Sequence, residues 1–175
     1  YLGLISLQTG VSIVEGLRAR GFNPVDIKWP NDILSEGKKL GGILIETRML
    51  ENGHFYLVIG FGLNVNQDMS QLSDSAQEQI DQPAISLSQI SARSQDREQL
   101  LTGLIPEIIN AIQCMNKDSV PGLLEKFSEL DYLQGKEVSV KTLNGTIFGR
   151  YLGVTQNGQI RIQTECAIEV FSAAE

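Results

Sequence analysis

Apolar residues at the start of the chain recur every three or four positions, which predicts a helix over residues 2–20. The apolar members of this stripe are Leu4, Leu7, Val11, Val14 and Leu17. Arg18 and Arg20 suit the negative end of the helix dipole, and Gly21 can end the helix. We expect this helix to pack against the strands that follow it.

The next part of the chain alternates between apolar runs and turn residues, a pattern typical of strands joined by hairpins. The predicted strands cover residues 25–29, 33–34, 40–47 and 55–65. Turns are marked by Pro30-Asn31-Asp32, by residues 35–38 and by Glu51-Asn52-Gly53. Because these connections are short, the strands should run antiparallel.

The second half of the chain changes character three times. Residues 66–83 are polar and predict a surface loop. Asp96 can cap a helix that runs through about Met115, and a second helix is predicted over residues 120–130. From residue 134 onward, short strands alternate with turns such as Asn144-Gly145 and Asn157-Gly158. The predicted strands of this last part are 138–143, 146–155, 159–163 and 167–171.

These elements predict an α+β fold: a mixed, largely antiparallel sheet with helices packed on one face, followed by a compact β-rich unit. About forty residues of short strands is the size of a small SH3-like β-barrel. The boundary between the two parts is expected near residue 133.

Composition narrows the functional classes. The 175 residues carry a net charge of -7, which argues against binding nucleic acid or an anionic membrane over the whole surface. Cys114 and Cys166 are too few for a disulfide framework or a zinc site and suit a reducing cytosol, and the single His54 excludes a multi-histidine metal site. No apolar run approaches the roughly 18–20 residues of a membrane span. Because the chain begins within a predicted helix and without methionine, we expect it to be part of a longer one.

Three neighbouring strands carry small or polar residues where a packed sheet would favour Val or Ile. These segments are Lys28-Trp29-Pro30-Asn31-Asp32, Lys38-Lys39-Leu40-Gly41-Gly42 and Gly60-Phe61-Gly62-Leu63-Asn64. Each has an ordinary explanation when taken alone: a turn, two solvated lysines, and a Gly-x-Gly without a following helix. Together, on adjacent strands, they predict one shared pocket whose glycines let a ligand approach the backbone.

The strings KWPNDI, KLGGILIE and IGFGLNVN, in this order and spacing, resemble the catalytic domain of biotin protein ligases. The resemblance covers essentially the whole chain. It implies that residues 1–133 form part of a biotin- and ATP-binding catalytic domain, similar in fold to class II aminoacyl-tRNA synthetases. It also implies that residues 134–175 form an SH3-like C-terminal domain. The family's glycine- and arginine-rich loop and its N-terminal part would precede Tyr1, and its usual closing strand would follow Glu175.

The resemblance implies a ligase that activates biotin with ATP to biotinyl-5′-adenylate and then biotinylates a lysine. Lys39 and Lys28 are the catalytic cations that it implies. The implied biotin-binding residues are Lys39, Gly41 and Gly42. The implied ATP- or adenylate-binding residues are Asn31, Asp32, Gly62 and Asn64, with Asp32 as a ligand of Mg²⁺.

The implied partner is a biotin carboxyl carrier protein in the cytoplasm. The resemblance also implies a homodimer through an exposed edge strand at Ile43–Met49, because members of the family dimerise by joining sheets side by side. No membrane or DNA contact is expected from this part, although an N-terminal winged helix elsewhere in the protein would bind DNA. Two alternatives stay open at this point: a lipoate-protein ligase-like adenylating enzyme, and a non-catalytic, dimerising, ligand-sensing part of a biotin operon repressor.

Overall fold

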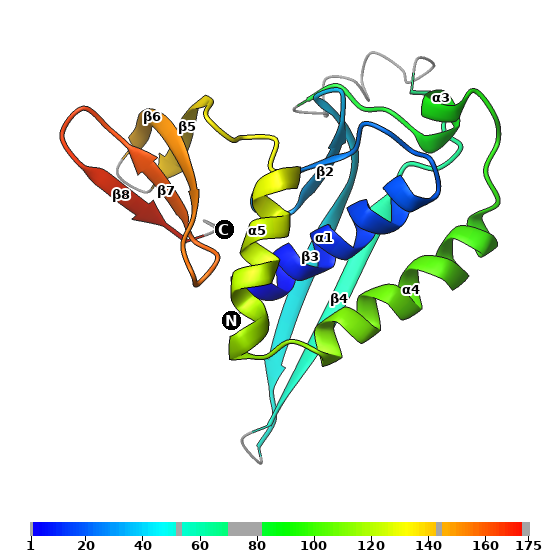
Figure 1. Ribbon diagram of the computed structural model, residues 1–175, viewed down its shortest axis with the longest axis horizontal. Coiled ribbons are helices and arrows are strands. Elements are labelled where there is room, and N and C mark those ends of the chain that lie inside the picture. The colour runs from blue at the N-terminus through cyan, green and yellow to red at the C-terminus, as the bar shows by residue number, and fades with distance from the viewer. Residues whose placement is uncertain (1, 52–53, 70–81, 143–144, 173–175) are drawn as a thin grey trace.

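The computed structural model describes residues 2–51, 54–69, 82–142 and 145–172. It contains two four-stranded antiparallel sheets and a group of helices (Figure 1). The predicted turn residues Asn52-Gly53 and Asn144 lie outside the described residues, as do residues 70–81 of the predicted loop.

The first sheet is a meander in which every strand pairs with its neighbour in the chain, in the order β1-β2-β3-β4. Its strands are β1 (Asp26–Lys28), β2 (Asp32–Ser35), β3 (Lys38–Met49) and β4 (Phe55–Leu63). All three pairings are antiparallel, as the short connections predict. Two isolated parallel bridges, Ile27 with Asp131 and Lys39 with Ala84, add the mixed character that was expected.

Helix α1 (Leu2–Ala19) covers one face of this sheet and confirms the helix predicted from the apolar stripe. All five apolar residues of that stripe are buried, together with Ile27, Ile33 and Ile43 of the sheet. A side chain at Gly10 would stand about 3.4 Å from the Ile27 Cδ1 and 3.5 Å from the Ile43 Cδ1, so the helix lies directly on the strands. Arg18 adds an ion pair of 3.0 Å between its Nη2 and the Asp26 Oδ1.

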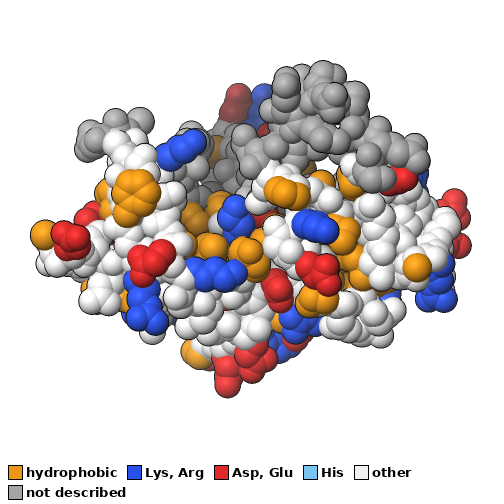
Figure 2. Space-filling model, turned by 90° about the horizontal axis from the view of Figure 1, so that it is seen from above, with side chains coloured by type: hydrophobic (Ala, Val, Ile, Leu, Met, Phe, Trp, Pro, Cys, Tyr) orange, Lys and Arg blue, Asp and Glu red, His pale blue; other side chains and the backbone are white. Residues whose placement is uncertain are grey.

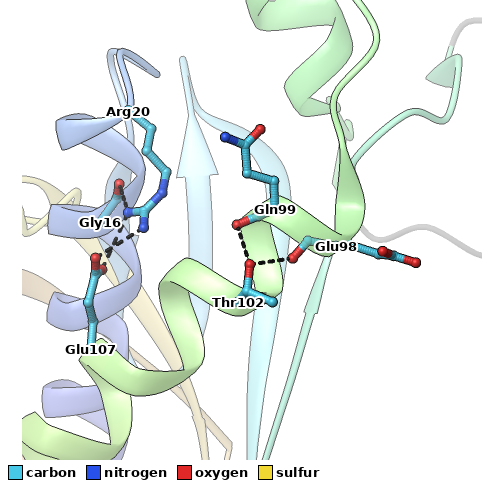
Figure 3. Close-up of polar contacts among 6 residues, drawn as sticks. All are labelled: Gly16, Arg20, Glu98, Gln99, Thr102 and Glu107. Atoms are coloured by element: carbon cyan, nitrogen blue, oxygen red, sulfur yellow. Dashed lines mark hydrogen bonds and ion pairs between the residues drawn. The ribbon is translucent and has the colours of Figure 1, made fainter.

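Two further helices, α4 (Arg97–Gln113) and α5 (Val120–Leu130), pack against α1 and confirm the two predicted helices (Figure 1). Arg20 joins α1 to α4, because its Nη2 pairs with the Glu107 Oε1 at 3.1 Å while its Nη1 donates to the Gly16 carbonyl (Figure 3). Asp96 caps α4 as expected, through bonds from the backbone N–H groups of Glu98 and Gln99.

Two short elements were not predicted from the sequence. Helix α3 (Leu87–Ser91) has a capping box formed by Ser86 and Gln89, and a 3-10 turn, η2 (Lys117–Ser119), precedes α5. Neither is long enough to show a hydrophobic repeat, which is the main sequence signal for a helix.

The second sheet has the order β5-β6-β7-β8, and its strands agree with the predicted ones to within a residue or two. They are β5 (Glu137–Thr142), β6 (Gly145–Val154), β7 (Ile160–Gln163) and β8 (Ile168–Phe171). Tyr151, Ile160 and Ile162 form its small core. Among the described residues β5 and β8 are the two edges of an open sheet, so a closed SH3-like barrel stays a prediction.

The two sheets meet at Trp29, which lies between them. Its indole N–H donates to the Gly158 carbonyl at 2.9 Å, and its ring packs against both apolar cores. A second link is the backbone bond from the Tyr132 N–H to the Ile27 carbonyl at 2.8 Å. We call the space of about 480 Å³ between the sheets the junction cleft. Its walls include Lys28, Trp29, Pro30, Val138, Lys141 and Tyr151.

Asp131 is buried beside this link between the sheets. Burial raises the pKa of its carboxyl, and the neighbouring Tyr151 hydroxyl and the Leu133 N–H partly offset that rise. Burial, with the nearby Asp131, also raises the pKa of the Tyr151 hydroxyl, so this group stays protonated. The Asp131 Oδ2 and the Tyr151 hydroxyl lack partners in good hydrogen-bond geometry.

The edge strand predicted at Ile43–Met49 is present in the described residues, and its use in dimerisation stays a prediction. This segment pairs along one side with β4, from Ile43 opposite Phe61 to Met49 opposite Phe55. On the other side, β2 ends its pairing at Gly42, so β3 has no strand partner beyond this point among the described residues. The segment therefore offers one open edge within a long hairpin that projects past the helices (Figure 1).

The visible face in Figure 2 carries basic and acidic side chains interspersed among apolar ones, without a large block of one sign. Within the described part of the chain, none of the helices combines the length and apolar character that crossing a bilayer requires.

Candidate functional site

The turn between β1 and β2 is fixed to β3 through Asn31. Its side-chain Nδ2 donates to the Ile43 carbonyl at 2.9 Å, and its own carbonyl accepts the Ile43 N–H at 2.9 Å. Asn31 therefore extends the β2–β3 pairing by one step and sets the position of Asp32, the first residue of β2.

A bulge in β3 places the side chain of Lys39 on the same face of the sheet as Gly42. Ile33 lies opposite Gly41 and Leu34 lies opposite Lys39, so Leu40 has no partner on β2. Leu40 is fully buried in the core, whereas the side chain of Lys39 is 40% exposed. Because a bulge shifts the alternation of side chains by one residue, Lys39 can face away from the core while Leu40 and Ile43 face it.

Lys39 and Asp32 form an ion pair, with 2.6 Å between the Lys39 Nζ and the Asp32 Oδ1. The other carboxylate oxygen, Oδ2, accepts a hydrogen bond of 3.0 Å from the Gln82 Nε2. The Gln82 Oε1 in turn accepts a bond of 3.2 Å from the Lys28 Nζ. Lys28, Gln82, Asp32 and Lys39 thus form one hydrogen-bonded network. Its members come from β1, β2, β3 and the segment before α3.

An open groove of about 490 Å³ runs over β2, β3 and β4 beside this ion pair. We call it the glycine groove; it is lined by Asn31, Asp32, Lys39, Gly42, Ile43, Leu44, Gly60, Phe61 and Gly62. A Cβ on Gly42 would point between Lys39 and Asp32, and one on Gly62 would meet nothing within 4 Å. The three glycines leave the backbone of two strands open to a ligand.

The structure brings five of the predicted site residues into the glycine groove: Asn31, Asp32, Lys39, Gly42 and Gly62. Lys28 is not among the lining residues; it reaches Asp32 through Gln82 and lines the junction cleft. Gly41 faces β4, where a Cβ would collide with the Gly62 carbonyl oxygen, so close strand pairing accounts for this glycine.

Asn64 also lies outside the residues that line the groove. Its Nδ2 donates to the carbonyls of Lys39 and Ile85, both at 3.2 Å, and its backbone N–H donates to the Leu40 carbonyl at 2.8 Å. Asn64 therefore connects β4 to the backbone of Lys39 and to the segment that leads into α3. Its contact with adenine stays a prediction.

Sequence reasoning missed Gln82. It falls in the polar segment that predicted a surface loop, and nothing in that composition distinguishes it from the neighbouring glutamines. Its position depends on a backbone pairing remote in sequence, because the Lys39 N–H donates to the Pro83 carbonyl at 2.7 Å.

The predicted Mg²⁺ site at Asp32 depends on which oxygen ligands surround its carboxylate. Both carboxylate oxygens of Asp32 already have partners, Lys39 and Gln82. Within the described ranges, no three His, Cys, Asp or Glu side chains gather closely enough to hold a metal ion. A metal ion at Asp32 would lie beside the Lys39 ammonium without a second carboxylate from the described residues to hold it, so these residues do not fit a resident ion.

The arrangement suits an elongated anion. The Lys39 ammonium lies beside the exposed backbone of the groove glycines. The Lys28 ammonium is held nearby by its hydrogen bond to Gln82. A carboxylate and a phosphate repel each other, and cations fixed in advance lower the cost of bringing them together. The Asp32 carboxylate holds Lys39 in place and can be exchanged for an anionic ligand.

Comparisons with known proteins agree with the motifs. Residues 2–64 match the model of the biotin/lipoate A/B protein ligase family. The chain is 33% identical to the bifunctional ligase/repressor BirA of Bacillus spizizenii, over 98% of this chain and 51% of that protein. It is 28% identical to the biotin–[acetyl-CoA-carboxylase] ligase of Mycobacterium tuberculosis, over 99% of this chain and 61% of that protein.

A solved structure agrees as well. The biotin protein ligase from Aquifex aeolicus in complex with biotin and ATP superposes with a TM-score of 0.81 at 27% identity, covering 98% of this chain and 68% of that one. The chain spans about half the length of the Bacillus relative. The match to the biotin/lipoate A/B protein ligase family model, over residues 2–64, covers α1, all of the first sheet and the glycine groove.

Proposed function

We propose that the full-length protein containing this chain joins biotin to ATP, giving biotinyl-5′-adenylate, and then transfers the biotinyl group to a lysine of a biotin carboxyl carrier protein. The observation that carries the proposal is the Lys39–Asp32 pair at the edge of the glycine groove. Similarity to a biotin–[acetyl-CoA-carboxylase] ligase and to a biotin protein ligase in complex with biotin and ATP supports the same reaction.

In the first step a biotin carboxylate oxygen forms a bond to the α-phosphorus of ATP, and the bond from that phosphorus to the bridging oxygen of pyrophosphate breaks. Lys39 is the ammonium that meets both the carboxylate and the α-phosphate, after Asp32 releases it. In the second step the acceptor amine bonds to the acyl carbon, AMP leaves with the electron pair, and the amine loses a proton. No covalent enzyme intermediate is needed, because the mixed anhydride is already activated.

The other residues divide between the two substrates. We assign biotin to the backbone at Gly41 and Gly42 together with Lys39. We assign the nucleotide to Asn31, Asp32, Gly62 and Asn64, with Lys28 as a second cation on the phosphate side. Mg²⁺ that accompanies ATP would arrive on the phosphates, since Asp32 is paired with Lys39 and Gln82 before ATP binds. We propose the cytoplasm as the site of the reaction, since ATP and the carrier protein are needed there together.

We further propose that the open edge of β3 beyond Ile43 pairs with another strand, either of a second copy or of the acceptor domain. An unpaired strand edge presents N–H and C=O groups that favour strand addition. The hairpin also exposes Leu44, Tyr56 and Val58, which are 60%, 57% and 55% exposed and share one face by register. Thr47→Pro should weaken self-association in sedimentation velocity, and an undiminished dimer would reject this placement.

The direct test of the proposed function is transfer to an acceptor. A purified carrier domain is incubated with the full-length protein, biotin and ATP with magnesium, and is then blotted with streptavidin. We expect labelling that disappears when the acceptor lysine is changed to arginine. The Lys39→Ala enzyme is the matched control for chemical biotinylation. Absence of labelling with a folded wild-type protein would reject the proposal.

A further inference from the structure

Gln82 occupies a position between two cations that the reaction needs. Its carboxamide accepts from the Lys28 Nζ at 3.2 Å and donates to the Asp32 Oδ2 at 3.0 Å, while the Asp32 Oδ1 holds Lys39 at 2.6 Å. The residue is partly buried, and it contributes both a donor and an acceptor to the chain of contacts.

We propose that Gln82 is a positioning residue for ATP: its carboxamide holds the Lys28 ammonium at a fixed place beside the Asp32–Lys39 pair. This inference rests on the proposed function, because it deepens the account of how the same site meets a polyphosphate. Gln82 acts through Lys28 and Asp32.

The backbone around Gln82 is held by the strand that carries Lys39. The Lys39 N–H donates to the Pro83 carbonyl at 2.7 Å, and the Lys39 carbonyl accepts the Ile85 N–H at 3.0 Å. The Asn64 amide reinforces this pairing by donating to the carbonyls of both Lys39 and Ile85. The backbone next to Gln82 is therefore fixed relative to Lys39. This pairing places the Gln82 carboxamide beside Lys28 and Asp32.

The chemistry of the carboxamide matters as much as its position. It is neutral, so it orients the Lys28 ammonium without neutralising it. In the described part of the chain Lys28 makes no ion pair within 4.0 Å, whereas Lys39 shares the single carboxylate of Asp32. Two ammonium groups face one carboxylate, and the surplus positive charge is what an incoming polyphosphate meets. A carboxylate in place of the amide would remove that surplus and repel Asp32.

A positioning role for Gln82 predicts an unusual order of variants. Gln82→Glu has nearly the shape of the wild-type side chain and keeps an acceptor for Lys28, but it loses the donor to Asp32 and adds a negative charge. If Gln82 only filled space, Gln82→Glu would behave like the wild type. If it positions a cation for ATP, Gln82→Glu should be at least as damaging as Gln82→Ala.

The experiment measures biotin-dependent ATP–pyrophosphate exchange by the full-length enzyme and its variants. For Gln82→Ala we expect kcat/KM for ATP to fall about tenfold, the usual scale for losing a hydrogen bond to a charged group, and KM for biotin to change less than about twofold. Gln82→Glu should lose about tenfold or more for ATP. Gln67→Ala is the matched control, because Gln67 lies in the same polar segment and its Oε1 accepts the Val65 N–H at 2.9 Å.

A double-mutant cycle separates positioning from general damage. Because Gln82 acts through Lys28, the combined Gln82→Ala and Lys28→Ala enzyme should be within about threefold of Lys28→Ala alone. Multiplicative losses, equal losses for biotin and ATP, or a Gln82→Glu enzyme with wild-type kinetics would each overturn the inference. Failure of the wild-type enzyme to exchange at all would instead reject the proposed function, so the two failures are distinguishable.

Discussion

A methyl group at Gly42 should block the ligand while leaving the fold intact. The added Cβ would stand 3.6 Å from the Asp32 Oδ1, 3.7 Å from the Asn31 carbonyl oxygen and 3.8 Å from the Lys39 Cε. These are ordinary van der Waals separations, so the fold gains no clash. Gly→Ala at a compatible position typically stabilises a protein by about 0.4–1 kcal/mol through the unfolded chain.

The effect on catalysis follows from where the methyl group points. It would lie in the glycine groove beside the Lys39–Asp32 pair, where we place the carboxylate of biotin. A ligand packed against the Gly42 backbone would have to move by about 1 Å, and a displacement of that size can cost on the order of 10² in rate. That loss corresponds to about 2.7 kcal/mol of transition-state stabilisation.

The assay combines thermal unfolding with ATP–pyrophosphate exchange. Gly122→Ala is the matched control, because a Cβ at Gly122 on α5 meets nothing within 4 Å and lies outside the groove. We expect both variants to unfold at or above the wild-type temperature and only Gly42→Ala to lose about 10² in kcat/KM for biotin. Exchange by a folded Gly42→Ala enzyme within threefold of the wild type would refute the placement of the ligand.

Three further changes give distinct outcomes. Lys39→Ala should reduce adenylate formation on the order of 10²–10³, the scale for losing a preorganised electrostatic contact, and exchange within tenfold of the wild type would contradict its role. Asn64→Ala removes donors to the Lys39 and Ile85 carbonyls and should lower the free energy of unfolding by about 1–2 kcal/mol in urea titration; an unchanged midpoint would show that these contacts do not hold the segment. Asp131→Asn keeps the acceptor for the Leu133 N–H but removes a buried charge. Because burial raises the pKa of Asp131 above its ordinary 3.8, the wild type loses stability as pH rises from about that value toward the raised pKa. The asparagine variant should therefore be the more stable protein at pH 7, by about 1.4 kcal/mol for each unit of the rise, with the gap closing near pH 3; a constant gap would contradict the assignment.

Local sequence patterns predicted most of the secondary structure. The stripe from Leu4 to Leu17 predicted α1, because a helix buries residues spaced three or four apart. The four-strand meander followed from short turns, and Asp96 marked the start of α4 through its side-chain cap. These features depend on neighbours along the chain.

The site could be predicted only in part. The glycines and charges of three strands pointed to one pocket, and five of the predicted residues do line it. The bulge at Leu40, the link from Lys28 through Gln82, and the use of the Asn64 amide within the fold depend on contacts between distant segments. No local spacing reports such contacts. The open edge at Ile43–Met49 agrees with the prediction, which came from the family resemblance.

Exchange of labelled pyrophosphate into ATP measures directly, without any acceptor protein, whether the glycine groove binds biotin and ATP together and promotes their condensation. With the full-length protein we expect exchange that requires biotin and stays at background when lipoate replaces it. Exchange supported equally by lipoate, or none with biotin in a folded protein, would contradict the account.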